Sequence, residues 1–214
     1  MKQLLMFTRI LCVIVALCIS GLGQAGKENF DWNWRGSEEL SWKQSINRNK
    51  NLSAAERNRL LDVISGQLRP SMTDLDIKSH TELRTVAGAT RIKYVDLNGD
   101  GRSEVIAQAG GENSGCSPTG NCPLWILCWH DGKYGALLNS EAQTFTIQTN
   151  KSEHFMDVVL TRHSSAFESE VKVYKFDGEF YRENGCYIAQ WQKLGDDGEY
   201  HEIKEPLIAE CGLT

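Results

Sequence analysis

The clearest chemical pattern in the sequence is a stretch of nine residues that begins at Asp96. Its odd-numbered positions carry oxygen donors, and the five candidate metal ligands are Asp96, Asn98, Asp100, Arg102 through its backbone carbonyl, and Glu104. Gly101 at the sixth position permits a tight curl that turns alternate residues toward one centre. Hard oxygen ligands in a flexible ring suit Ca²⁺ better than Mg²⁺, which requires a small octahedral shell. The spacing therefore predicts a Ca²⁺ site, and we expect the ion to stabilise the structure rather than to catalyse a reaction.

Strands, rather than helices, are expected on both sides of this calcium loop (residues 96–104). A helix–loop–helix calcium hand runs for twelve residues and ends on a bidentate Glu, but Ala107 occupies the twelfth position here. The flanking pairs Tyr94-Val95 and Val105-Ile106 are rich in the β-branched and aromatic residues that strands favour. The loop instead resembles the Asp-x-Asn-Gly-Asp-Gly-x-x-Glu loop of FG-GAP and VCBS-type repeats, which implies a Ca²⁺-binding connection between two strands. Those families carry several tandem copies, whereas this sequence contains one.

A metal-free turn is the alternative interpretation of the calcium loop. Asp, Asn and Gly also favour turns for backbone reasons that involve no ion. A turn alone does not require acids at the first, fifth and ninth positions together, so the spacing favours Ca²⁺.

The first 25 residues have the organisation of a cleavable export signal. Two basic residues precede an uninterrupted apolar run over residues 10–19, and small residues lead up to Ala25. The run is about half as long as a membrane-spanning helix, so cleavage after Ala25 is favoured over a membrane anchor. The calcium loop with residues 116–123 and 163–167 also resembles a group of exported proteins of environmental bacteria, which implies no particular activity. We therefore expect a periplasmic or secreted protein.

The charge balance of the mature chain argues against a nucleic-acid partner. Without residues 1–25, 21 Lys and Arg face 28 Asp and Glu, a formal net charge of −7. Binding to phosphate backbones draws on clustered Lys and Arg, and binding to an anionic membrane surface does the same. We therefore expect neither nucleic acid nor a membrane as a partner after cleavage. A protein or a cell-wall component is the expected partner, and the oligomeric state stays open.

Five cysteines remain after cleavage, in a compartment where disulfides persist. Cys116 and Cys122 flank a loop-forming stretch, so a local disulfide is expected, and Cys186 with Cys211 is the natural second pair. Cys128 is left over, and we expect it to be a small buried hydrophobe in a strand. The first three cysteines lack the close Cys-x-x-Cys pairs of zinc sites.

Two helices are predicted in a helical N-terminal part, residues 26–89. Ser53 and Glu56 form a capping box, and an apolar stripe at helical spacing follows until Pro70 ends the helix. Ser79 and Glu82 repeat the capping pattern before a shorter helix. We expect the apolar stripe of the first helix to pack on a sheet.

Residues 90–214 are predicted to form an antiparallel β part within one globular domain that also includes residues 26–89. Seven apolar or alternating segments predict strands at 91–95, 105–107, 124–129, 145–147, 156–160, 171–176 and 186–191. Three Asp-Gly pairs at 131–132, 177–178 and 197–198 predict hairpin turns. The expected fold class is α+β and mainly antiparallel β, with short N-terminal helices followed by a β-meander. Both a curved sheet and a propeller-like blade fit that pattern.

No established catalytic motif is present, neither His-Glu-x-x-His nor Gly-x-Ser-x-Gly. The expected function is therefore non-enzymatic binding, with the glycine-rich loop at residues 110–123 as the recognition surface. An exported hydrolase acting on glycan or peptide is one alternative, and it requires His154, Asp157 or His163 to converge with an acid in a cleft. A secreted inhibitor of a hydrolase is the other, and an exposed loop closed by Cys116 and Cys122 would favour it.

Overall fold

The structure is a computed structural model that describes residues 44–71, 73–74, 76–110 and 113–212; the predicted export signal lies outside the described residues. The elements in chain order are α1 (Ala54–Leu68), the 3₁₀ helix η1 (Arg69–Ser71), α2 (His80–Ala89), β1 (Arg91–Val95), β2 (Glu104–Gln108), β3 (Cys122–His130), β4 (Lys133–Ala142), β5 (Thr144–Ser152), β6 (Phe155–His163), β7 (Glu168–Phe176), β8 (Tyr181–Leu194) and β9 (Tyr200–Glu210). None of the helices formed by the described residues has the length and hydropathy needed to cross a membrane.

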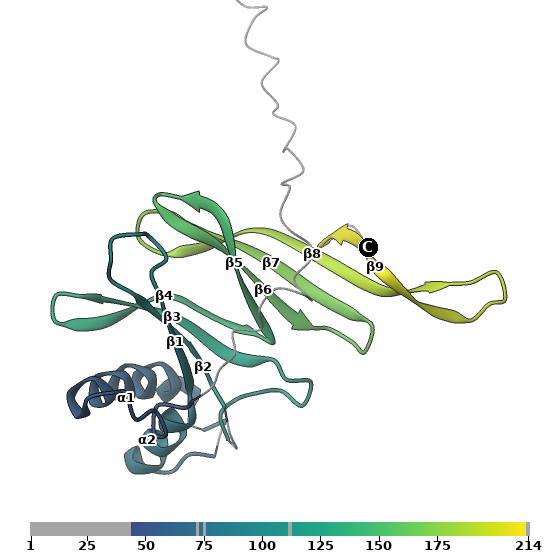
Figure 1. The fold of residues 1–214 in the computed structure, drawn as a ribbon. Coiled ribbons are helices and arrows are strands. Elements are labelled where there is room, and N and C mark those ends of the chain that lie inside the picture. The colour runs from purple at the N-terminus through teal and green to yellow at the C-terminus, as the bar shows by residue number, and fades with distance from the viewer. Residues whose placement is uncertain (1–43, 72, 75, 111–112, 213–214) are drawn as a thin grey trace, which may run out of the picture. The chain divides into compact units, whose positions relative to one another are not determined.

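The strands form two antiparallel meanders in which each strand pairs with its neighbours in sequence (Figure 1). The first sheet has the order β1-β2-β3-β4, and the second has the order β5-β6-β7-β8-β9. Figure 1 shows α1 and α2 beside the first sheet. The fold class is therefore the predicted one, α+β with mainly antiparallel β structure.

Each face of the first sheet packs into an apolar core of its own. On one face, α1 and α2 pack against Val105, Ala107 and Trp125, as the apolar stripe of α1 predicts. On the other face, Ile106 and Ile126 pack against residues of the second sheet. Side chains alternate between the two faces of a strand. Because both faces of the first sheet are covered, the central strand β2 is buried along its whole length. The layers are thus helices, first sheet and second sheet, and the calcium loop leads directly into the most buried strand.

Both helices begin where the capping residues predict. Ser53 Oγ accepts a hydrogen bond from the Glu56 N–H at 3.1 Å, and Ser79 Oγ accepts one from the Glu82 N–H at 3.1 Å. These bonds satisfy backbone donors that have no partner within the first turn. The Glu82 carboxylate caps the same end by accepting from the Lys78 N–H at 2.9 Å.

The Glu56 carboxylate makes long-range bonds instead of the predicted return bond to Ser53. Its Oε1 accepts from the hydroxyl of Tyr94 at 3.0 Å and from the hydroxyl of Tyr134. Burial, followed by the hydrogen bond to Glu56, raises the pKa of both tyrosines above the ordinary value of this side chain. Glu56 therefore fixes the first turn of α1 to β1 and β4.

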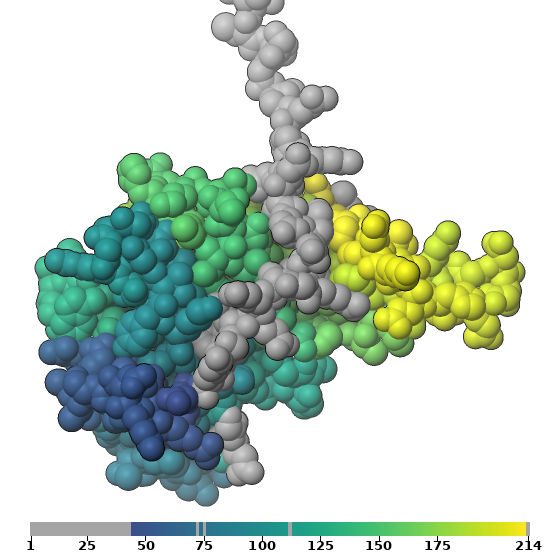
Figure 2. Space-filling view, in the orientation of Figure 1, coloured from purple at the N-terminus to yellow at the C-terminus, as the bar shows by residue number. Residues whose placement is uncertain are grey.

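All three Asp-Gly pairs lie in hairpin connections, as predicted. Asp131 and Gly132 join β3 to β4 with φ values of 51° and 78°, the left-handed conformation that a two-residue hairpin turn requires. The other two pairs lie between β7 and β8 and between β8 and β9. The β8–β9 hairpin carries exposed Leu194 and Tyr200, and Figure 2 shows its yellow end standing clear of the other coloured elements.

Candidate calcium site

The calcium loop connects β1 to β2, and its last residue, Glu104, is the first residue of β2. Gly99 and Gly101 adopt φ values of 82° and 84°, the left-handed region that glycine enters without steric cost. A Cβ on Gly101 would meet no atom within 4 Å, so its backbone conformation, rather than space, requires glycine there. The structure thus confirms the expected connection between two strands.

Asp96 organises the first half of the calcium loop through both of its carboxylate oxygens. Oδ1 accepts from the Gly99 N–H at 2.7 Å, and Oδ2 accepts from the Gly101 N–H at 2.9 Å. Desolvation acts to raise the pKa of the Asp96 carboxyl, but these backbone N–H donors outweigh it and hold the pKa below the ordinary value. Asp96 therefore presents a carboxylate anion at the centre of the turn.

Asn98 and Asp100 each fold back onto the backbone two residues ahead. Asn98 Oδ1 accepts from the Asp100 N–H at 2.9 Å, and Asp100 Oδ1 accepts from the Arg102 N–H at 2.7 Å. The Asn98 amide also donates to Asp100 Oδ2 at 3.2 Å. These successive Asx turns curl the loop and place the polar side chains of its odd positions within one turn.

Glu104 differs from the other acids because it is buried, with 2% of its surface exposed. Its Oε2 accepts a hydrogen bond from the Leu97 N–H at 2.8 Å. Burial is the largest influence on its carboxyl and raises its pKa, and the negative charges of Asp100 and Asp96 act in the same direction. A cation beside these three acids would relieve that repulsion.

The chemistry of the donor set fits Ca²⁺, but the carboxylate oxygens do not converge on a common position that could hold the ion. Among the described residues, Asp96, Asp100 and Glu104 do not form a group whose ligand oxygens all lie within 4.8 Å of one another. The three carboxylates and the Asn98 oxygen are nevertheless the hard donors that Ca²⁺ selects. Binding would therefore draw the carboxylates of Asp96, Asp100 and Glu104 closer together.

The calcium loop is also anchored to the second sheet. Leu97 is fully buried in the core between the sheets, and its carbonyl accepts from the Met156 N–H of β6 at 2.8 Å. Lys151 Nζ of β5 donates to the Asn98 carbonyl at 3.2 Å. Lys151 carried no local signal in the sequence, because it lies 53 residues from Asn98. The loop thus joins three structural parts: β1, β2 and the β5–β6 hairpin.

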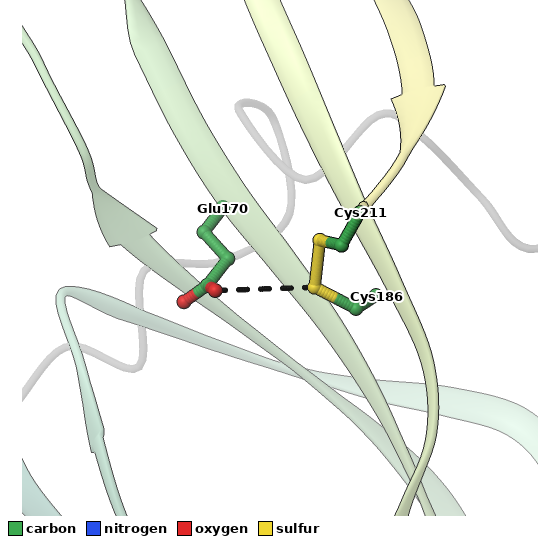
Figure 3. Close-up of side chains that lie close together, drawn as sticks. All are labelled: Glu170, Cys186 and Cys211. Atoms are coloured by element: carbon green, nitrogen blue, oxygen red, sulfur yellow. Dashed lines mark hydrogen bonds between the residues drawn. A yellow bond between two sulfur atoms is a disulfide. The ribbon is translucent and has the colours of Figure 1, made fainter. Parts of the chain in front are cut away.

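The two predicted disulfides are both present, Cys116–Cys122 and Cys186–Cys211. Figure 3 shows Glu170 beside the second bond, with its Oε1 3.9 Å from Cys186 Sγ. These three residues form the group of potential metal ligands found among the described residues. Zinc binds thiolates, and disulfide sulfurs are not thiolates, so the group is a covalent cross-link beside an acid rather than a metal site.

Cys128 is the free cysteine of the described residues; it lies in strand β3 as predicted, but it is half-buried rather than buried. Burial raises the pKa of its thiol, and the charges of Glu104 and Asp100 raise it further. A raised pKa leaves the thiol protonated and weakly nucleophilic at neutral pH. Cys128 is therefore an unreactive neighbour of the calcium loop.

The described part of the predicted recognition loop is closed by the first disulfide and fastened to the end of β6. The Asn121 side chain donates to the His163 carbonyl at 2.9 Å and accepts from the His163 N–H at 2.8 Å. Within the loop, the Ser117 N–H donates to the Asn121 carbonyl at 2.7 Å. Pro118, Thr119 and Gly120 at its tip are exposed. The loop is therefore an exposed tip on a fixed base.

The residues considered for hydrolysis do not converge. His154 is exposed in the β5–β6 turn, and Asp157 is buried and accepts from Ser152 Oγ at 2.7 Å. His163 stands six positions beyond Asp157 on the same strand, a separation of about 20 Å in an extended chain. These side chains therefore form no catalytic trio.

Comparisons with known proteins leave the site to be interpreted from its own geometry. No protein-family model, no curated protein and no solved structure matches this chain.

Proposed function

We propose that this protein is an exported, calcium-stabilised binding domain without catalytic activity. The observation that carries the proposal is the calcium loop, in which Asp96, Asn98 and Asp100 form successive turns beside the buried Glu104. These are the ligand types and the flexible ring that Ca²⁺ prefers. The ion neutralises part of the repulsion among three carboxylates and has no substrate-facing role.

The structural role of the ion follows from what the loop connects. Leu97 fills the core between the sheets, and its carbonyl accepts from Met156 of the second sheet. A ligand that binds only the native state stabilises that state in proportion to the logarithm of its concentration. Ca²⁺ bound at the loop therefore stabilises the attachment of β1 and β2 to the β5–β6 hairpin.

Export is supported by the cysteine chemistry of the described residues together with the pattern of residues 1–25. Four of five described cysteines are paired in disulfides, and such bonds persist in the periplasm and outside the cell but are rare in the cytosol. Extracellular fluids also supply the high Ca²⁺ concentrations that weak sites require.

Direct titration of calcium tests the metal assignment. The mature chain from Gly26 is stripped with EDTA, dialysed and titrated with Ca²⁺ in a calorimeter. We expect one saturable site in the native protein and none in the Asp96→Asn/Asp100→Asn variant. The variant Asp131→Asn/Asp197→Asn loses the same two charges at two other Asp-Gly turns, and it should bind like the native protein. Equal heats for native protein and the loop variant would remove the calcium assignment.

The recognition surface we propose is the exposed tip at residues 118–120, because the disulfide and Asn121 hold it on a rigid base. Loops held by a rigid scaffold are common recognition sites. Sedimentation of the mature protein with purified cell-wall polysaccharide tests this surface. Binding that Thr119→Ala weakens, and that Thr149→Ala on β5 leaves unchanged, supports it. Equal binding by both variants, or none by the native protein, contradicts it.

The exposed, disulfide-closed tip also favours the inhibitor alternative. A rigid loop loses little conformational entropy when it enters an active-site cleft. Steady-state assays of secreted glycosidases and peptidases with added mature protein test this function. Saturable inhibition that Thr119→Ala relieves supports inhibition over cell-wall binding, and unchanged rates across the panel argue against it.

A further inference from the structure

A cavity of about 770 Å³ lies away from the calcium loop, where the turn before α1, the end of α2 and the start of β1 meet. This volume is in the range of sites that bind small molecules. Its described polar lining consists of donor-rich side chains: Gln44, Ser45, Asn47, Arg48, Thr85 and Arg91. None of the described lining residues is acidic. The described lining is therefore cationic, although the mature chain as a whole is acidic.

No carboxylate of the described residues neutralises the two guanidinium groups of this cavity. Neither Arg48 nor Arg91 has an ion pair with any described residue. Arg91 Nη2 donates to Gln108 Oε1 at 3.3 Å, whereas Arg91 Nε is buried and has no hydrogen-bond partner among the described residues. A buried donor without a partner is costly. Arg91 Nε is therefore unsatisfied, but it is itself inaccessible to solvent and does not open into the cavity.

The carbonyl end of α2 does not replace an anion. A helix C-terminus carries a partial negative charge of roughly half an electron and favours cations nearby. Two of these carbonyls already accept from other groups, since Asn47 N–H donates to Gly88 O at 3.0 Å and Thr90 N–H donates to Ala87 O at 3.1 Å. The partial charge of the helix end is smaller than the charge of one guanidinium group, so among the described residues it does not balance the two arginines.

The backbone turn that carries Arg48 is held in place by contacts with α1 and α2. Arg57 of α1 donates to the carbonyls of Ile46 and Asn49, which holds the turn that carries Arg48. The Asn47 side chain packs against Gly88 so closely that a Cβ there would come within 2.1 Å of its amide nitrogen. A preformed site loses less free energy to ordering when it binds a ligand.

We propose that this cavity binds a small anionic ligand through Arg48 and Arg91, with a carboxylate or a phosphate as the recognised group. Planar guanidinium groups match both oxyanions, and each offers paired N–H donors. The amide and hydroxyl side chains of the lining supply further hydrogen bonds to the neutral part of the ligand. This proposal does not depend on Ca²⁺ binding, because the cavity and the calcium loop share no residue.

Titration with simple anions tests the site. The mature chain, stripped with EDTA and then dialysed free of it, is titrated with inorganic phosphate and, separately, with succinate, and sodium chloride holds the ionic strength constant. We expect saturable binding at one site by at least one anion, and the anion that binds more tightly identifies the recognised group. Arg48→Gln and Arg91→Gln should each weaken binding at least tenfold. Arg91→Lys should weaken it less, because lysine keeps the positive charge although it lacks the paired N–H donors of the guanidinium group.

Arg69→Gln is the matched control, because Arg69 is exposed and lies outside the cavity; it should bind like the native protein. Arg48 is also exposed, so its substitution leaves the fold intact and decides the result if Arg91→Gln fails to fold. Absence of saturable binding of both anions, or native affinity in Arg48→Gln, would overturn the proposal. The calcium titration is a separate measurement, so failure of either site is recognised independently.

Discussion

Glu104 Oε2 accepts a hydrogen bond from the Leu97 N–H at 2.8 Å, so the buried acid at the end of the calcium loop holds the residue that inserts into the core between the sheets. The two residues are seven positions apart and belong to the same turn. This bond relates the electrostatics of the loop to the packing of the fold. Changes at the loop should therefore alter global stability as well as metal binding.

Removing the Glu104 acceptor should destabilise the protein. Glu104→Ala leaves the buried Leu97 N–H without a partner, which costs about 1–3 kcal/mol of unfolding free energy. Glu104→Gln keeps an acceptor oxygen and removes the repelled charge, so it should cost less in calcium-free buffer. Urea unfolding in EDTA measures both variants. If the two variants lose the same stability, the Glu104–Leu97 bond is not a significant contributor.

Truncating Leu97 tests whether the loop anchors the two sheets. Leu97 is fully buried between them, and Leu→Ala substitutions at such positions cost about 2–5 kcal/mol. Leu207 is 51% exposed on β9, so Leu207→Ala is a matched control and should change stability by less than about 0.5 kcal/mol. Urea midpoints compare the variants, and equal losses would contradict the anchoring role of Leu97.

The two disulfides should stabilise the protein to different extents. Their sequence separations are 25 residues for Cys186–Cys211 and 6 for Cys116–Cys122. In the chain-entropy model, these loops correspond to about 3.5 and about 2 kcal/mol respectively. Urea unfolding of the two double Cys→Ser variants measures the unfolding free energy that each disulfide contributes. A larger loss of stability on removing Cys116–Cys122 than on removing Cys186–Cys211 would contradict the prediction.

The acid dependence of stability should include Asp177 in the β7–β8 turn. The Phe180 N–H, then Arg182, then the Glu179 N–H lower the pKa of this carboxyl to about 2, from an ordinary value of about 3.9. The ionised Asp177 carboxylate therefore stabilises the folded state fully above pH about 4. This stabilisation is lost as the pH falls toward about 2, because the carboxyl of the unfolded chain binds its proton at a higher pH than that of the folded chain. Urea midpoints from pH 2 to pH 5 measure this slope.

Asp177→Asn should flatten the slope between pH about 4 and about 2. The control is Asp131→Asn, the same substitution in the β3–β4 turn, where the carboxylate contacts exposed His130. An unchanged slope in Asp177→Asn would show that the Phe180, Glu179 and Arg182 contacts contribute little in solution.

Local patterns predicted most of the elements but not the two strands with mixed sequences. Capping residues marked both helices, and apolar segments marked seven strands. β4 was missed because Gly135 and several polar residues interrupt its apolar alternation. β9 was missed because it is an edge strand that is largely exposed along its length, so burial imposes no alternation on it. Pro206 in β9 further obscured the strand, since proline is tolerated at sheet edges.

Long-range contacts set the limit for predicting the site. The curl of the calcium loop follows from its own residues, since Asp96, Asn98 and Asp100 bond to backbone groups two to five positions ahead. The contacts that the loop makes with Lys151 and Met156 of the second sheet do not follow from the loop residues. Tertiary packing, rather than local spacing, also decides that Glu56 bonds to Tyr94 and Tyr134.

Thermal unfolding of the mature protein in EDTA and in millimolar Ca²⁺ tests the central claim most directly. Because a ligand that binds only the native state must raise the unfolding midpoint, we predict a rise with Ca²⁺ in the native protein and in Asp131→Asn/Asp197→Asn. The same rise should be absent from Asp96→Asn/Asp100→Asn. An unchanged midpoint in the native protein, or an equal rise in the loop variant, would contradict a calcium-stabilised fold.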